Sequence, residues 1–149
     1  MHADQYAKQH LFQPLGIDTF YWKITPTGII DTEGGLYLRP EDLAKFGYLY
    51  SNNGVWDGER ILPQGWVDQT MSPAIKDPGW EAHYGYQWWL LPYEDGGQQW
   101  AWTGLGYGGQ RLLVIPEYDL IAVFTGWNIY DKPALDPQYA LARVLESIR

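Results

Sequence analysis

The 149-residue sequence contains no cysteine, which excludes thiolate catalysis, cysteine-based zinc sites and a disulfide framework. Basic residues are few, with 10 Lys and Arg against 18 Asp and Glu, and they form no cluster. The resulting charge of −8 is a poor match for a phosphate backbone and argues against nucleic-acid binding. No apolar run approaches the ~20 residues that a membrane-spanning helix needs, so the sequence predicts no membrane partner. The first residues carry neither a basic stretch nor an apolar run, and we expect no signal peptide in them.

Serine is also scarce, and this limits the candidates for a nucleophile to Ser51, Ser72 and Ser147. None of the three lies in a G-x-S-x-G or an S-x-x-K motif. We therefore expect no catalytic nucleophile in this chain.

Metal-ligating patterns are equally sparse, since the three histidines have no H-x-x-x-H spacing. Glu81 and His83 would share one face of an extended strand, but two ligands in a polar segment are more typical of a solvated loop. The sequence predicts neither a metal site nor a cofactor.

Aromatic residues are abundant, at 17% of the chain, with 9 Trp and 12 Tyr. They fit an aromatic-rich sheet core or a face that stacks flat ligands such as sugars. On a strand, Trp100 and Trp102 would share a face, whereas Trp88 and Trp89 would point to opposite sides. A free-standing carbohydrate-binding module is therefore an alternative function.

The two parts of the chain differ in pattern. Residues 1–80 predict helix and loop: helices over 4–14, 40–53 and 63–71, a loop over 18–38 and a small hairpin around 57–59. Residues 81–149 predict antiparallel strands over 84–91, 98–103, 110–115 and 120–125, followed by a helix over 136–148. We expect one α+β domain over residues 1–149, with an antiparallel sheet of three to four strands and flanking helices.

The segment from Thr103 to Gln110 is rich in glycine and contains a literal G-x-G-x-x-G. A dinucleotide site needs a helix after this motif, but the residues that follow read as a strand. Two interpretations remain open: a glycine-rich hairpin turn, or a strand edge whose backbone N–H groups approach a ligand closely and stabilise an oxyanion.

Six segments, in order, resemble motifs of the serine β-lactamase-like hydrolases. This group includes class C β-lactamases, penicillin-binding DD-peptidases, related esterases and 6-aminohexanoate-oligomer hydrolases. The segments are residues 10–17 (like I-F-x-P-L-G-M), 34–47 (like G-G-L-x-x-[ST]-x-x-D-L-A-x-F-G), 53–62 (like N-G-G-x-x-x-G-x-x-I-L), 84–89 (like Y-G-Y-x-W-W), 106–110 (G-Y-G-G-Q) and 114–123 (like V-x-P-x-x-D-L-V-V-V).

The resemblance implies that this chain is the C-terminal part of such a fold, because the group's S-x-x-K and Y-x-N elements lie upstream of the I-F-x-P-L-G segment. The group's third catalytic element is K-T-G or a variant, on the strand that borders the active site. By resemblance, the residues of this chain that face the substrate and the oxyanion are Thr103, Gly104, Leu105, Gly106, Tyr107 and Gly108. Its register is either residues 102–104 or 104–106, so the oxyanion N–H is that of Leu105 or Tyr107. Neither register begins with Lys or His, which favours an ester or amide substrate over a β-lactam.

A partial sheet would leave backbone groups unpaired at its edge. Each such group costs about 1–3 kcal/mol when buried, and an open edge pairs readily with other chains. We therefore expect association, with another copy of this chain or with an N-terminal half.

Overall fold

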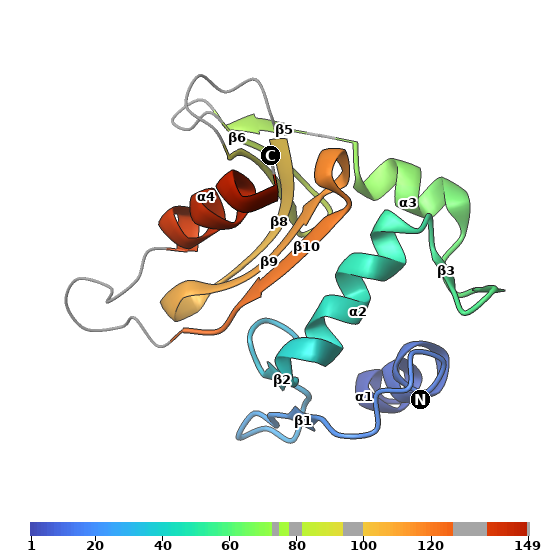
Figure 1. The fold of residues 1–149 in the computed structure, drawn as a ribbon. Helices are drawn as coiled ribbons and strands as arrows, with labels where there is room; N and C mark the ends of the chain where they lie inside the picture. Colours follow the sequence, from blue (N-terminus) through green and yellow to red (C-terminus); the bar gives the residue numbers. More distant parts are fainter. Residues whose placement is uncertain (73–74, 78–81, 94–99, 127–136, 149) are drawn as a thin grey trace.

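The computed structural model describes residues 1–72, 75–77, 82–93, 100–126 and 137–148. A six-stranded antiparallel sheet lies between helix α4 (Pro137–Ile148) on one face and helices α2 (Pro40–Ser51) and α3 (Gln64–Thr70) on the other side (Figure 1). The expected α+β class is confirmed. Within the described ranges, no helix is long and apolar enough to cross a membrane.

The sheet has the strand order β10-β9-β8-β7-β6-β5, so each strand pairs with its neighbours in sequence. Its strands are β5 (Ile75–Asp77), β6 (Ala82–Gly85), β7 (Trp88–Pro92), β8 (Trp100–Gly106), β9 (Gln110–Ile115) and β10 (Leu120–Phe124). The expected segment 98–103 begins outside the described residues, and β8 continues three residues beyond its predicted end.

The sheet contains more strands than the three to four expected, for two reasons. The predicted strand 84–91 is interrupted by a turn at Tyr86 and Gln87, whose φ angles of 48° and 72° end β6 and reverse the chain into β7. In addition, β5 pairs with β6 through Ile75↔Tyr84. The turn contains no glycine, so the usual signal for a two-residue hairpin loop is missing from the sequence.

The predicted helices are present. The first consists of α1 (Ala3–Ala7) and a π-helical turn over Lys8–Phe12, and it ends before Pro14. Pro40 begins α2, and α3 follows Pro63. The predicted helix 136–148 is α4, and its expected first residue, 136, lies outside the described residues.

Two short hairpins flank these helices. The predicted loop 18–38 contains β1 (Tyr21–Trp22) paired with β2 (Leu36–Tyr37). The predicted hairpin around 57–59 is present as β3 (Val55–Trp56) and β4 (Glu59–Arg60), joined by Asp57 and Gly58 at positive φ.

Each face of the sheet is covered by its own apolar cluster. On one face, Leu141 and Leu145 of α4 pack against Leu113 and Ile115. On the other, residues of α2 pack against Trp88, Leu112 and Val114. Burying each large apolar side chain contributes roughly 1.5–3 kcal/mol relative to exposure, so these clusters fix the helices on the sheet.

Gly47 brings α2 close to the sheet. A Cβ atom at this position would lie 2.9 Å from Ile121 Cγ2 and 3.1 Å from Leu112 Cδ1. Such distances are below van der Waals contact, so the helix can pack this tightly on β9 and β10 only with glycine here.

Candidate active-site strand

The glycine-rich segment forms the hairpin between β8 and β9. The strands pair up to Gly106↔Gln110, and Tyr107–Gly109 form the loop between them. Gly108 and Gly109 have φ angles of 75° and 92°, and residues with a side chain rarely adopt such a backbone conformation. The segment is therefore a glycine-dependent hairpin turn, as the first of the two interpretations proposed.

The end of β8 also has an open backbone edge. The pairing between β7 and β8 runs from Pro92↔Trp100 to Trp89↔Thr103. In the described part of the sheet, residues 104–106 pair with β9 alone, because β8 runs past the start of β7. No described strand pairs with this edge, which keeps the second interpretation open as well.

The predicted site residues separate into two groups. Thr103 is fully buried and its hydroxyl donates to the Ala101 carbonyl at 3.3 Å, so its side chain belongs to the core. Thr103 lies opposite Leu113 and thus on the α4 face of the sheet. Leu105 and Tyr107 are 37% and 77% exposed.

Residues 104–108 lie at the end of β8 and in the loop after it, where three glycines alternate with the exposed side chains of Leu105 and Tyr107. Alternate residues of an extended strand direct their N–H groups to the same edge. The N–H groups of Leu105 and Tyr107 are thus equivalent in direction if the chain stays extended through Gly106, whose φ and ψ are −123° and 159°. Both registers of the third motif remain compatible with the hairpin.

The hydroxyls of two of the three candidate serines make local hydrogen bonds. Ser72 Oγ donates to the Asp68 carbonyl and Ser147 Oγ to the Val144 carbonyl, each at 2.7 Å. Ser51 is the last residue of α2. Such bonds are typical of helix ends rather than of activated nucleophiles.

The described residues contain no group of three His, Asp or Glu side chains arranged for a metal ion. Glu81, one half of the weak pair considered from the sequence, lies outside the described residues. His83 packs against the ring of Trp100, with ring centroids 5.4 Å apart.

Trp88 and Trp102 contribute to the core, whereas Trp66 is 41% exposed. Trp88 is 8% exposed, and Trp102 packs on its cluster. Trp89 lies opposite Thr103 and so faces away from Trp102, which lies opposite Val114. The predicted alternation is confirmed, and it leaves Trp88 and Trp102 packed rather than free for ligand stacking.

A buried carboxylate on α2 is a feature that sequence reasoning missed. Asp42 is fully buried, accepts a hydrogen bond from Arg39 Nε at 2.7 Å and lies 2.8 Å from Lys45 Nζ. The hydrogen bond from Arg39 and the ion pair with Lys45 hold the pKa of Asp42 below its usual range, although burial opposes this. Lys45 also donates to the Gly16 carbonyl at 2.9 Å, so the cluster fastens the N-terminal segment to α2. The i,i+3 spacing of Arg39, Asp42 and Lys45 could have indicated these ion pairs from the sequence.

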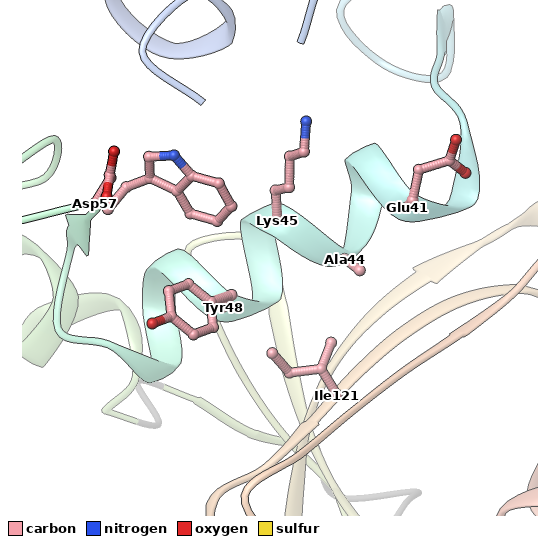
Figure 2. A pocket seen from close by; sticks show the side chains of 7 residues that line it. Glu41, Ala44, Lys45, Tyr48, Asp57 and Ile121 are labelled. Atoms are coloured by element: carbon pink, nitrogen blue, oxygen red, sulfur yellow. The ribbon is translucent and has the colours of Figure 1, made fainter. Parts of the chain in front are cut away.

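The outer side of α2 borders a groove of about 550 Å³ (Figure 2). Its lining residues are Glu41, Ala44, Lys45, Tyr48, Trp56, Asp57 and Ile121. Ile121 belongs to β10, so this groove is separate from the hairpin at the end of β8. Nothing in the sequence pattern predicted it.

Comparison with known proteins agrees with the resemblance. The profile of the Beta-lactamase family matches residues 1–128. The 6-aminohexanoate-dimer hydrolase of Paenarthrobacter ureafaciens is 31% identical over 109 residues, which are 67% of this chain and 27% of that protein.

Two solved structures have a similar fold. A Bacillus anthracis protein assigned as a 6-aminohexanoate-dimer hydrolase superposes with a TM-score of 0.71 and 26% identity, over 95% of this chain and 35% of that one. A Bacteroides dorei protein assigned as a beta-lactamase gives a TM-score of 0.63 at 17% identity, over 94% and 49%. The chain thus spans about a quarter to a half of the length of these relatives. By sequence profile and by fold, the chain belongs to the β-lactamase family of hydrolases.

Proposed function

We propose that this chain supplies the oxyanion and substrate side of a β-lactamase-like serine hydrolase that cleaves ester or amide bonds. The observation that carries the proposal is the end of β8, where residues 104–106 run past β7 and leave one backbone edge open. Fixed N–H donors at such an edge are suited to the negative charge that develops on a carbonyl oxygen during acyl transfer.

The proposed reaction divides between two parts of the enzyme. A serine on the complementary part attacks the carbonyl carbon, and the carbonyl π electrons move to the oxygen. The N–H of Leu105 or Tyr107 donates to this oxyanion. The serine hydroxyl gives its proton to a base on the complementary part, and this group returns the proton to the alcohol or amine as the intermediate collapses and expels it. Water then loses a proton to the same base and attacks the acyl-serine, which releases the carboxylic acid and restores the serine hydroxyl.

The first residue of the K-T-G-like motif indicates which class of substrate the enzyme takes. In the two registers the first position is Trp102 or Gly104, neither of which can pair with a substrate carboxylate. Two relatives are named 6-aminohexanoate-dimer hydrolases, and a dimer of an amino acid is joined by an amide bond. Both points favour linear amides or esters over β-lactams with an acidic group.

We also propose that the isolated chain is catalytically inactive. Ser51, Ser72 and Ser147 all lack the S-x-x-K context, and the hydroxyls of Ser72 and Ser147 are bonded to their own helices. Activity should therefore require a part that brings the nucleophile.

The test uses a chimera in which the part of the Paenarthrobacter hydrolase upstream of the matched segment is joined to residues 1–149. We expect hydrolysis of p-nitrophenyl acetate by the chimera and none by the isolated chain. Replacing Leu105 or Tyr107 by its α-hydroxy analogue removes a single N–H and keeps the side chain. One of these two replacements should lower kcat by about 10²–10³-fold, and the other should not.

Two results would contradict the proposal. One is turnover by the isolated chain at the rate of the chimera. The other is a folded, active chimera in which neither backbone replacement changes kcat, since the end of β8 would then not contact the reacting carbonyl.

A further inference from the structure

Two consecutive residues with side chains adopt left-handed backbone in the turn between β6 and β7. Tyr86 and Gln87 have φ angles of 48° and 72°, and both are exposed. This conformation is unfavourable for a residue with a Cβ atom, and glycine would adopt it more easily. Backbone strain of this kind persists only where surrounding contacts hold it, and it is concentrated at active sites and ligand clamps. The turn is therefore a candidate for a functional role.

Contacts from α3 hold the side chain of Tyr86 in place. The ring of Trp66 meets the ring of Tyr86 edge-on, with centroids 5.5 Å apart. Gln69 Nε2 donates a hydrogen bond to the Tyr86 hydroxyl. Despite these contacts, Trp66 is 41% exposed and Tyr86 is 45% exposed. The two rings thus form a fixed aromatic surface that is partly open to solvent.

The pairing register places this aromatic surface beside the open edge of β8. The first residue of β7 that pairs with β8 is Trp89, opposite Thr103. The chain turns at Gln87, two residues before this pair, and β8 continues past the pair through Leu105. Because the two strands are antiparallel, both segments extend toward the same end of the sheet. The turn therefore borders the open edge of residues 104–106, where the proposed oxyanion donor lies.

The side chains at this surface indicate which kind of chemical group it can bind. The four residues of the turn and of its contacts with α3 carry no charge: Trp66, Gln69, Tyr86 and Gln87. Aromatic rings bind alkyl chains and other rings, because the contact removes apolar area from water. A charged group placed here would lose hydration and would find no opposite charge among these four residues. The surface therefore favours an uncharged alkyl or aryl chain.

We infer that Trp66 and Tyr86 form one wall of the substrate cleft and select esters or amides with a long uncharged chain beside the scissile bond. Gln69 keeps the Tyr86 ring in the orientation that the chain contacts. This inference rests on the proposed function, because it takes the position of the reacting carbonyl from the proposed oxyanion strand. It adds to that function the residues that recognise the chain of the substrate.

Three esters, hydrolysed by the chimera defined above, test this selection. Ethyl acetate is the short reference, ethyl hexanoate carries the long chain on the acyl side, and hexyl acetate carries it on the alcohol side. Contact with the two rings should raise kcat/KM for one of the long esters about tenfold or more above that for ethyl acetate. The ester that shows the increase identifies which side of the scissile bond lies against the wall.

Trp66→Ala and Tyr86→Gly should each remove most of this preference and leave kcat/KM for ethyl acetate essentially unchanged. Glycine suits the positive φ at position 86, so Tyr86→Gly removes the ring without straining the turn. Trp66→Phe keeps an aromatic ring and should retain much of the preference. A purely structural role of the rings would change the rates for all three esters together.

Tyr37→Ala is the matched control. Tyr37 belongs to another exposed ring pair, with Tyr21 at a centroid distance of 5.6 Å, in the hairpin of β1 and β2. This substitution removes an aromatic ring of similar exposure and should leave the preference for the long ester intact. An equal loss of preference in this variant would overturn the assignment to Trp66 and Tyr86.

Two further results overturn the inference. The first is an active chimera that hydrolyses all three esters with similar kcat/KM. The second is an equal fall of kcat/KM for all three esters in Trp66→Ala and Tyr86→Gly, because the rings would then only support the fold or contact the complementary part.

Binding to the isolated chain separates failure of this inference from failure of the proposed function. Hexanamide, titrated into the ¹⁵N-labelled chain, should shift the NMR signals of the Trp66 indole N–H and the Tyr86 amide in a saturable manner and leave the Tyr37 amide unmoved. A folded but inactive chimera together with these shifts contradicts the proposed function and supports the binding wall. Absence of the shifts overturns the inference, whether or not the chimera is active.

Discussion

A Cβ atom on Gly106 would lie 2.7 Å from the Cβ of Gln110, so this pair closes the β8–β9 hairpin only because one member has no side chain. The carboxamide of Gln110 also donates a hydrogen bond to the Gly126 carbonyl. The shape of the proposed oxyanion strand therefore depends on a contact between its last residue and the first residue of the next strand.

Gly106→Ala should lower the free energy of unfolding by about 1–3 kcal/mol, because the added methyl group overpacks the end of the hairpin. Urea denaturation measures this effect. Gly104→Ala is the control, since its Cβ would meet Leu112 Cβ at an ordinary 3.7 Å. Equal losses for the two variants would contradict the steric account.

Gly47→Ala should destabilise the chain even though alanine favours helix. The gain in helix propensity is about 1 kcal/mol, but the methyl group would lie 2.9 Å from Ile121 Cγ2 and displace α2 from the sheet. Gly65→Ala in α3 meets no atom within 4 Å and should stabilise by about 0.5–1 kcal/mol. Thermal melts of the two variants should move in opposite directions, and a shift of both to higher temperature would show that α2 does not pack as described.

Asp42→Asn should lower the free energy of unfolding at pH 7 by about 1–3 kcal/mol, because it weakens the charge-assisted hydrogen bond from Arg39 and removes the ion pair with Lys45 at a buried position. The pKa of Asp42 is lower in the folded chain than in the unfolded chain, chiefly because Arg39 donates to it. The paired carboxylate thus stabilises the fold fully above the ordinary carboxyl pKa of about 3.9, and this contribution is lost as the pH falls through the lower, folded pKa.

Urea denaturation from pH 7 to pH 2 measures that dependence. The difference in the free energy of unfolding between the original chain and the Asp42→Asn variant should become smaller as the pH falls. Glu41→Gln serves as the control, because Glu41 lies 3.4 Å from Arg39 with both side chains at least half exposed, and such a pair contributes little. If this difference in the free energy of unfolding does not vary with pH, protonation of Asp42 is not what changes the stability of the fold.

The sequence predicts the elements that follow local rules. Pro40, Glu41 and Asp42 mark the start of α2, and the apolar stripe from Leu43 to Tyr50 faces the sheet as the periodicity requires. The strands β9 and β10 were likewise predicted within a residue of their bounds, because both are short apolar runs separated by a turn containing Pro116.

Features that depend on tertiary register were not predictable in this way. The turn at Tyr86 and Gln87 uses left-handed backbone in residues that rarely adopt it, and so the break between β6 and β7 gave no signal. Burial of Thr103 follows from which face of the sheet its strand position occupies. The groove at α2 and the contact between Trp66 and Tyr86 arise only where segments far apart in the sequence meet.

The central claim is that this chain carries the oxyanion strand of a serine hydrolase and not its nucleophile. Intact-mass spectrometry after treatment with a fluorophosphonate probe tests it most directly, with the isolated chain and the chimera measured side by side. The account predicts no adduct on the isolated chain and one adduct on the chimera, at the serine of its upstream part. A stoichiometric adduct on Ser51, Ser72 or Ser147 of the isolated chain would contradict it.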